Sequence, residues 1–117
     1  MIALPSPESL LPLPPAAFHI LLSLAEDDRH GYAIIQDVAG RTDGEVTLGA
    51  GTLYRTIQRM LEQDLIVEVD APAGSADERR RYYRATSFGR SVARAEAERL
   101  AGLVKLARAS GLSPRKS

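Results

Sequence analysis

Residues 51–63, with the sequence GTLYRTIQRMLEQ, have the spacing of an amphipathic helix. At about 100° per residue, the apolar side chains gather on one side of this helix, and they are Leu53, Tyr54, Ile57, Met60 and Leu61. The other side carries hydrogen-bonding groups and two guanidinium groups, from Thr52, Arg55, Thr56, Arg59 and Gln63. The first set predicts a face that is buried in a core. The second set predicts a polar ridge that is free to contact a partner.

Two shorter helices are predicted before this segment. Residues 16–25 and residues 31–39 both place apolar side chains at helical spacing, and Pro15 suits the first turn of the earlier helix. Residues 40–51 form a glycine-rich connector. Further upstream, the density of proline predicts that residues 1–13 form a flexible arm.

A β-hairpin and a long helix are predicted after it. Residues 65–69 and 80–85 have the pattern of two short strands, joined by a turn that is rich in proline and glycine. Arginines lie at the start of the second strand, and Tyr83 within it is expected to point toward the core. Thr86 is the expected N-cap of a final helix over residues 87–109. Gly111 is expected to end that helix, which leaves residues 111–117 as a flexible tail.

The final helix has an apolar stripe that is wider than one small domain can cover. A terminal helix with this much apolar surface is expected to pack against a second copy of itself. Residues 87–110 are therefore predicted to be a dimerisation helix. The side chains expected in the interface are Phe18, Phe88, Val92, Leu100, Leu103, Val104 and Leu106.

The order of these elements indicates the fold class. Three helices followed by a two-stranded hairpin is the order of a winged helix-turn-helix, in which the third helix enters the major groove of DNA and the hairpin touches the backbone or the minor groove. We therefore expect a mainly α protein with a small β-hairpin. It consists of a winged helix-turn-helix domain over residues 14–86 and the C-terminal dimerisation helix.

Short motifs along the chain resemble those of the PadR family of bacterial transcriptional regulators. They are HGYAI at residues 30–34, GTLY at 51–54, RMLE at 59–62, LI at 65–66, YYRAT at 82–86 and GR at 89–90. The resemblance covers about Leu13 to Leu106, and it implies a homodimeric repressor that grips a near-palindromic DNA operator. Two positions depart from the family: many relatives have proline in place of Arg55 and glycine in place of Asp64.

The expected DNA contacts come from the third helix and the hairpin. Arginine can donate two parallel hydrogen bonds to guanine, and it also binds phosphates, so Arg55 and Arg59 are expected to touch DNA. Thr52 and Thr56 fit groove contact and helix capping equally well. Tyr54 is expected at the edge of the core, with its hydroxyl near a phosphate. The complete predicted set is Thr52, Tyr54, Arg55, Thr56, Arg59, Arg79, Arg80 and Arg81, in which the hairpin arginines would contact the backbone.

The composition excludes several other classes of protein. A chain of 117 residues can bury one small core, and the absence of cysteine excludes disulfides and thiolate metal sites. The two histidines are predicted to have structural roles, so no metal and no cofactor are expected. The carboxylate pairs Asp27–Asp28 and Glu96–Glu98 are expected on helix ends or flanks without burial, where their pKa values cannot be tuned for acid–base catalysis. We expect a soluble cytoplasmic protein that is not an enzyme and has no membrane span.

Two alternatives stay open from the sequence. The first is a winged-helix protein-interaction module that docks another protein through the last helix and never touches DNA. The second adds a small apolar or aromatic effector to the regulator, bound between the last helix of one subunit and the first helix of the other. Such a ligand has an effect only if it binds two spacings of the DNA-reading helices with different affinity.

Overall fold

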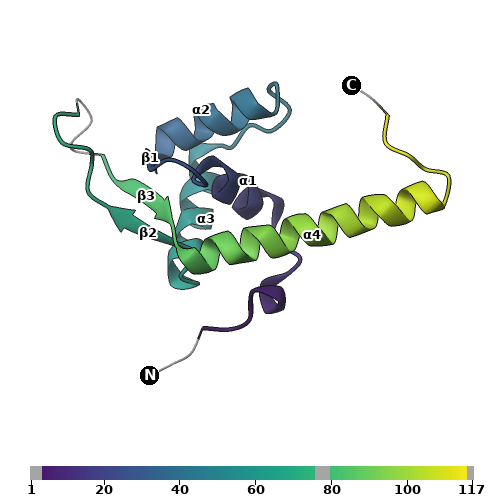
Figure 1. Ribbon diagram of the computed structural model, residues 1–117. Helices are drawn as coiled ribbons and strands as arrows, with labels where there is room; N and C mark the ends of the chain where they lie inside the picture. The colour runs from purple at the N-terminus through teal and green to yellow at the C-terminus, as the bar shows by residue number, and fades with distance from the viewer. Residues whose placement is uncertain (1–3, 76–79, 116–117) are drawn as a thin grey trace.

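The computed structural model describes residues 4–75 and 80–115, which form a winged helix-turn-helix with a long C-terminal helix (Figure 1). Within these residues there are four α-helices: α1 (Pro15–Ser23), α2 (Gly31–Arg41), α3 (Ala50–Glu62) and α4 (Ser87–Ala109). The short strands β1 (Arg29–His30), β2 (Ile66–Val69) and β3 (Tyr82–Ala85) form an antiparallel sheet in the order β1-β3-β2, and a 3₁₀ turn, η1 (Pro7–Leu10), precedes α1. The predicted fold class is confirmed.

Helices α1, α2 and α3 pack around one core. Each contributes a side chain that is fully buried there, namely Ile20, Ile34 and Leu53. Leu65 and Val92 extend the same core toward the sheet and toward the first half of α4. Burying one such aliphatic side chain stabilises the fold by about 1.5–3 kcal/mol. This packing fixes which side of α3 faces outward.

The hairpin of β2 and β3 forms the wing, and β1 completes the sheet on the far side of β3. Tyr82 pairs with Val69 on one side and with His30 on the other. Sequence patterning did not predict β1, because two residues are too few to show alternation. Tyr83 packs into the core as predicted. Tyr82 is buried as well, and its ring makes a T-shaped contact with the ring of His30, with 5.3 Å between the centroids.

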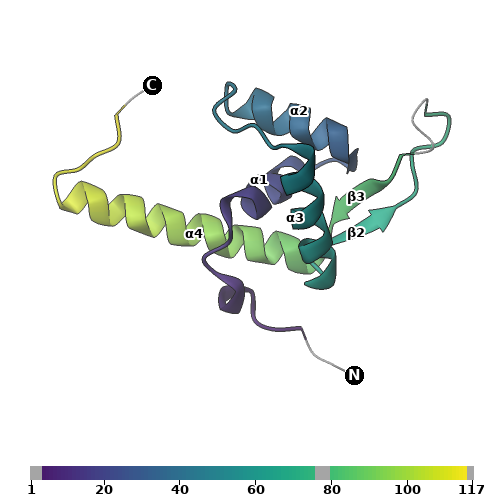
Figure 2. The same ribbon diagram turned by 180° about the vertical axis from the view of Figure 1, so that it is seen from behind.

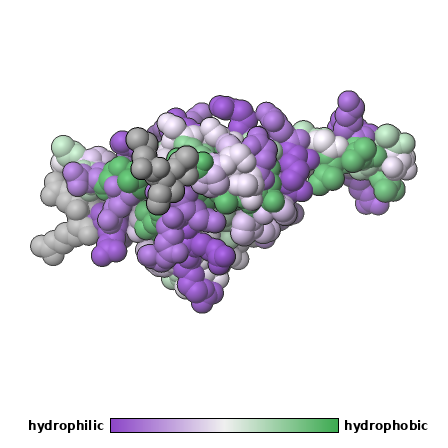
Figure 3. Space-filling model, turned by 90° about the horizontal axis from the view of Figure 1, so that it is seen from below, coloured by the Kyte–Doolittle hydropathy of each residue, from purple (hydrophilic) through white to green (hydrophobic). Residues whose placement is uncertain are grey.

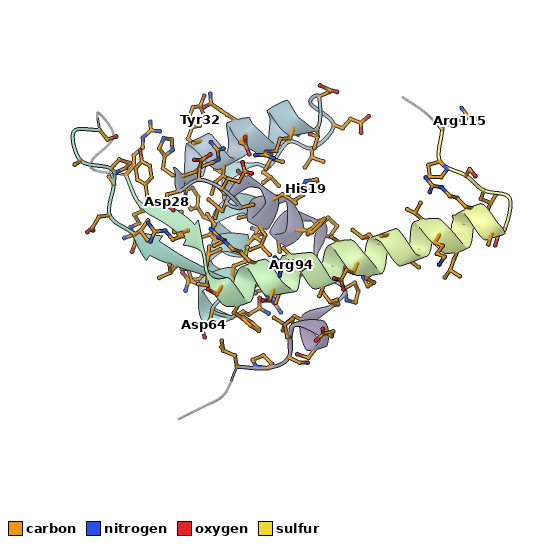
Figure 4. The ribbon with its side chains drawn as sticks, viewed as in Figure 1. His19, Asp28, Tyr32, Asp64, Arg94 and Arg115 are labelled. Carbon is orange, nitrogen blue, oxygen red and sulfur yellow. The ribbon has the colours of Figure 1, made fainter. Side chains whose placement is uncertain are left out.

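The C-terminus of α3 has the hydrogen bonds of a Schellman motif. The N–H of Leu65 donates to the carbonyl of Met60 at 3.0 Å, and the N–H of Asp64 donates to the carbonyl of Leu61 at 3.2 Å. Asp64 has a φ of 59°, in the left-handed region that favours glycine. The hydroxyl of Thr86 donates to the backbone carbonyl of Asp64 at 2.6 Å, which joins this turn to the start of α4. Figure 4 shows Asp64 at that junction.

Asp64→Gly is expected to raise the free energy of unfolding by roughly 0.5–1 kcal/mol. Glycine adopts a positive φ without the steric strain that a side chain causes, which stabilises the folded state. This stabilisation exceeds the destabilisation that comes from the greater conformational entropy of glycine in the unfolded chain. The bond from Thr86 is retained because its acceptor is the backbone carbonyl. Urea-induced unfolding measures the change. The matched control is Asp70→Gly, at an exposed aspartate outside the helices, which should not stabilise; a lower midpoint for Asp64→Gly would contradict the prediction.

Residues 7–13, within the predicted flexible arm, are ordered against the rest of the domain. The turn η1 packs against α4, and Leu13 is buried. The backbone N–H of Leu13 donates to Oε2 of Glu96 at 2.9 Å. Proline disfavours a long α-helix here, but it does not prevent a short 3₁₀ turn and an extended stretch from burying Leu13. In Figure 2 this segment passes alongside α3 and crosses α4.

Glu96 was expected to lie on the surface of its helix, but only 2% of the residue is exposed. Its Oε1 pairs with Nε of Arg99, while its Oε2 accepts from Leu13. The hydrogen bond from Arg99 lowers the pKa of Glu96, so the group stays charged. Both oxygens are occupied by structural partners. Glu96 therefore holds the N-terminal segment on α4 and has no free oxygen for acid–base chemistry.

Candidate nucleic-acid interface

The outer face of α3 is a polar strip that the core packing turns toward solvent. Leu53, Ile57 and Met60 are buried on the opposite side of the helix. The exposed side chains are Thr52, Tyr54, Arg55, Gln58, Arg59 and Glu62, and Thr56 and Gln63 lie half-buried at one edge. Figure 2 shows α3 in front, between the N-terminal segment and the wing.

Arg55 and Arg59 carry the positive charge of this strip. Among the residues that the structure describes, neither guanidinium group makes an ion pair or a side-chain hydrogen bond. Other arginines of the domain do form ion pairs: Arg41 pairs with Asp37 at 2.7 Å, and Arg84 pairs with Asp28 at 2.8 Å. The two arginines on α3 are therefore available to an external anion or base edge.

Thr56 does not offer its hydroxyl proton to a partner. Its hydroxyl donates to the carbonyl of Thr52 at 2.7 Å, within the same helix. The hydroxyl oxygen can still accept a hydrogen bond. Thr52 is exposed in the first turn of α3, whose N-cap, Gly49, has no side chain to bond the first N–H groups. Of the two threonines, Thr52 is the better placed for contact with DNA.

Two side chains of this strip were missed by the sequence analysis. Gln58 and Glu62 are exposed, and they lie three and seven residues after Arg55 on the same side of the helix. The Nε2 atom of Gln58 donates to Oε1 of Glu62 at 3.3 Å. The signal was present in the helical spacing, but sorting the residues into one apolar side and one polar side left both unassigned. The burial of Leu53, Ile57 and Met60 shows that the outward direction runs between Arg55 and Gln58.

Tyr54 lies at one edge of α3, and 52% of its surface is exposed. Its ring lies against Gly31 at the start of α2, where a Cβ atom would collide with the Tyr54 hydroxyl. The second residue of the HGYAI motif is therefore a glycine because α3 approaches α2 closely. Any larger side chain at position 31 would displace Tyr54.

A cavity of about 540 Å³ separates this edge of α3 from the wing. We name it the wing-root pocket, and its lining residues are His30, Gly31, Tyr32, Tyr54, Arg80, Arg81 and Tyr83. The guanidinium carbon of Arg80 lies 5.8 Å from the centre of the Tyr32 ring, and Nη1 of Arg80 lies 3.1 Å from Nε2 of His30. Figure 4 shows Tyr32 at the start of α2, on the side of the wing. Phenol hydroxyls beside guanidinium groups make this pocket suited to an anion.

The wing arginines differ in how available they are. Arg79 lies outside the described residues. Arg81 is exposed and pairs loosely with Glu68 at 3.4 Å. Arg84 makes two hydrogen bonds to Asp28, at 2.9 and 2.8 Å, and these bonds lower the pKa of Asp28. Arg84 is therefore part of the fold, while Arg80 and Arg81 line the pocket.

The second half of α4 extends beyond the domain and carries an exposed apolar face (Figures 1 and 3). Leu103 and Leu106 are 50% and 65% exposed, and Leu100 and Val104 are exposed beside them. Phe18 and Phe88 are partly buried against the protomer's own core. Val92 was expected in the dimer interface, but it is completely buried in that core. Val92 cannot reach a second copy, so it is removed from the predicted interface.

The described residues hold no group of three or more histidine, cysteine, aspartate or glutamate side chains that could bind a metal ion. None of their helices is long and apolar enough to cross a membrane. His30 has a structural role, since its Nδ1 accepts a hydrogen bond from the N–H of Ala33 and caps α2.

Comparisons with known proteins agree with this geometry. The model of the transcriptional regulator PadR-like family matches residues 20–95. A transcriptional regulator from Clostridium thermocellum is 25% identical with a TM-score of 0.68, over 80% of this chain and 86% of its own. A PadR family transcription regulator from Clostridium difficile is 26% identical with a TM-score of 0.69, over 80% and 94%. An uncharacterised protein of Lysinibacillus sphaericus is 38% identical over 72 residues, which span 62% of this chain and 65% of that protein.

Proposed function

This chain belongs to the PadR-like family of transcriptional regulators, and we propose that it is a sequence-specific DNA-binding repressor that acts as a homodimer on a near-palindromic operator. Members of this family are regulators and not enzymes. The observation that carries the proposal is the pair of arginines on α3, which project outward without a partner among the described residues.

In this proposal α3 lies in the major groove. A groove about 12 Å wide admits one α-helix. Arg55 and Arg59 are one helical turn apart, so both reach the groove floor or its phosphate walls together. Each arginine that binds a guanine edge through two hydrogen bonds contributes about 1–3 kcal/mol of discrimination. Thr52 and Thr56 lie on the flank of the same strip and contact the adjacent backbone.

The wing-root pocket receives the DNA backbone beside α3. A phosphate placed there accepts hydrogen bonds from the hydroxyl groups of Tyr32 and Tyr54, while Arg80 and Arg81 supply positive charge. Such contacts fix the register of the protein on the duplex without reading its sequence. Because the chain has no net charge, these local groups provide most of its attraction to DNA.

In this proposal the second copy of the protein binds to the exposed apolar face of α4. Covering this face stabilises the dimer by about 25 cal/mol for each Å² of apolar surface that is buried. The side chains concerned are Leu100, Leu103, Val104 and Leu106. Pairing through this helix would present two α3 helices to the same face of the duplex, about 34 Å apart or a multiple of that distance.

A small apolar or aromatic effector would act on the spacing of the two α3 helices. A cavity of about 350 Å³ lies between α1 and the first half of α4, and it is lined by leucine and alanine side chains together with Glu26, Arg90 and Arg94. A ligand between α4 of one subunit and α1 of the other would relieve repression if it bound the DNA-incompatible spacing more tightly.

Selection of bound oligonucleotides from a random pool tests the proposed function. The purified protein is expected to enrich one short sequence. Enrichment should weaken as salt is raised, because phosphate contacts release counterions. A pool that stays random after repeated rounds would contradict the proposal, and it would favour a protein-interaction module built on the same fold.

A further inference from the structure

Gln58 lies on the outer face of α3, beside Arg55. It follows Arg55 by three residues and precedes Arg59 by one, and Glu62 lies one turn further along. These four side chains and Gln63 border a shallow hollow of about 500 Å³ on the surface of the helix. All four are exposed, so whatever α3 contacts meets the Gln58 amide together with the two guanidinium groups.

The amide of Gln58 is oriented by its neighbour. Nε2 donates one of its two protons to Oε1 of Glu62 at 3.3 Å. Gln58 keeps its second N–H as a donor and its carbonyl oxygen as an acceptor. A contact between this end of the strip and the DNA backbone is unfavourable, because the carboxylate of Glu62 repels phosphates.

One base edge matches this pair of groups. In the major groove adenine presents N7 as an acceptor and the N6 amino group as a donor, and a glutamine side chain satisfies both at once. Guanine presents two acceptors, which suit arginine and not the oxygen of an amide. The rise from Arg55 to Gln58 is about 4.5 Å, close to the 3.4 Å step between base pairs.

We propose that Gln58 reads one adenine in each half of the operator, next to the guanines that Arg55 or Arg59 contacts. Glu62 is a positioning residue, which fixes the amide so that its donor and acceptor face the base. This inference rests on the proposed function, since it requires α3 to lie in the major groove.

The first test compares the sequences that four proteins select from the same random pool. The wild type is expected to enrich an A·T pair adjacent to a G·C pair in each half-site. Gln58→Ala should lose the preference at the A·T position and keep it at the G·C positions. Glu62→Ala should weaken the same A·T preference, while its affinity for unrelated DNA rises because a negative charge has been removed. The matched control is Gln36→Ala, at an exposed glutamine on α2, which should select the wild-type sequence.

The second test changes the DNA and leaves the protein intact. Replacing the selected adenine by 7-deazaadenine removes the N7 acceptor, and it is expected to lower wild-type affinity roughly fivefold or more. The affinity of Gln58→Ala for the same two oligonucleotides should differ by less than twofold. Fluorescence anisotropy with labelled duplexes measures all four values.

The outcomes separate this inference from the proposed function. An unchanged A·T preference in Gln58→Ala, or equal wild-type affinity for adenine and 7-deazaadenine, would overturn the role of Gln58 while α3 remains the reading helix. A wild-type protein that selects no sequence would overturn the proposed function and this inference with it.

Discussion

Arg59→Ala is expected to lower affinity for the selected operator roughly 30-fold or more. Each protomer loses about 1–3 kcal/mol of contact with DNA, and a dimer loses it twice. Folding should be unaffected, because Arg59 is exposed and makes no ion pair or side-chain hydrogen bond with the described residues. Anisotropy titrations at two salt concentrations measure the affinity, and a thermal melt checks the fold.

The salt dependence shows what Arg59 contacts. If the side chain binds a phosphate, the plot of log affinity against log salt concentration becomes less steep by about 1 for each protomer. If it binds a guanine edge, the slope of that plot is nearly unchanged, and the preference for the operator over unrelated DNA is lost instead. The matched control is Arg94→Ala, at an exposed arginine on α4 that faces α1 (Figure 4). Wild-type affinity in Arg59→Ala would contradict the placement of α3 in the groove.

Leu103→Glu is expected to convert the dimer to a monomer and to lower operator affinity by about 10²-fold or more. Two charges would be buried at the centre of the proposed α4 interface, where no described residue covers Leu103. Separating the subunits then removes the gain that comes from linking two half-sites, about 10²- to 10⁴-fold. Sedimentation measures the mass, and anisotropy measures the affinity.

The control for that variant is Lys105→Glu, which changes charge in the same turn of α4 on the opposite side of the helix. It should remain dimeric. Because Leu103 lies in the part of α4 that extends beyond the core, Leu103→Glu should keep the melting behaviour of a folded winged helix. A dimeric Leu103→Glu protein would show that another surface joins the subunits.

The sequence predicts best those features that depend on neighbouring residues. The bounds of α3 and α4 follow from strong periodicity, and Thr86 caps α4 as expected by accepting from the N–H of Gly89 at 2.8 Å. The end of α3 at Asp64 was harder to predict. A residue with a side chain occupies the left-handed position there, and only the surrounding hydrogen bonds show that the turn is formed.

Features that depend on distant contacts could not be predicted in this way. The N-terminal segment is ordered by Glu96, 83 residues further along the chain from Leu13. Val92 and Leu103 belong to one apolar stripe in the sequence, yet the first is buried in the core and the second is exposed. Periodicity identifies an apolar stripe but does not show where the domain ends beneath it. Gln58 was missed for a related reason, because the outward direction of α3 is set by packing.

The spacing and orientation of the half-sites in the selected DNA test the central claim most directly. If two copies of α3 are held by α4 on one face of the duplex, the enriched sequences will contain an inverted repeat with centres about 10–10.5 base pairs apart, or a whole multiple of that distance. Inserting about 5 base pairs between the halves should then abolish tight binding, because it turns one half-site to the far side of the duplex. A single unrepeated site, or a direct repeat that tolerates the insertion, would contradict the account.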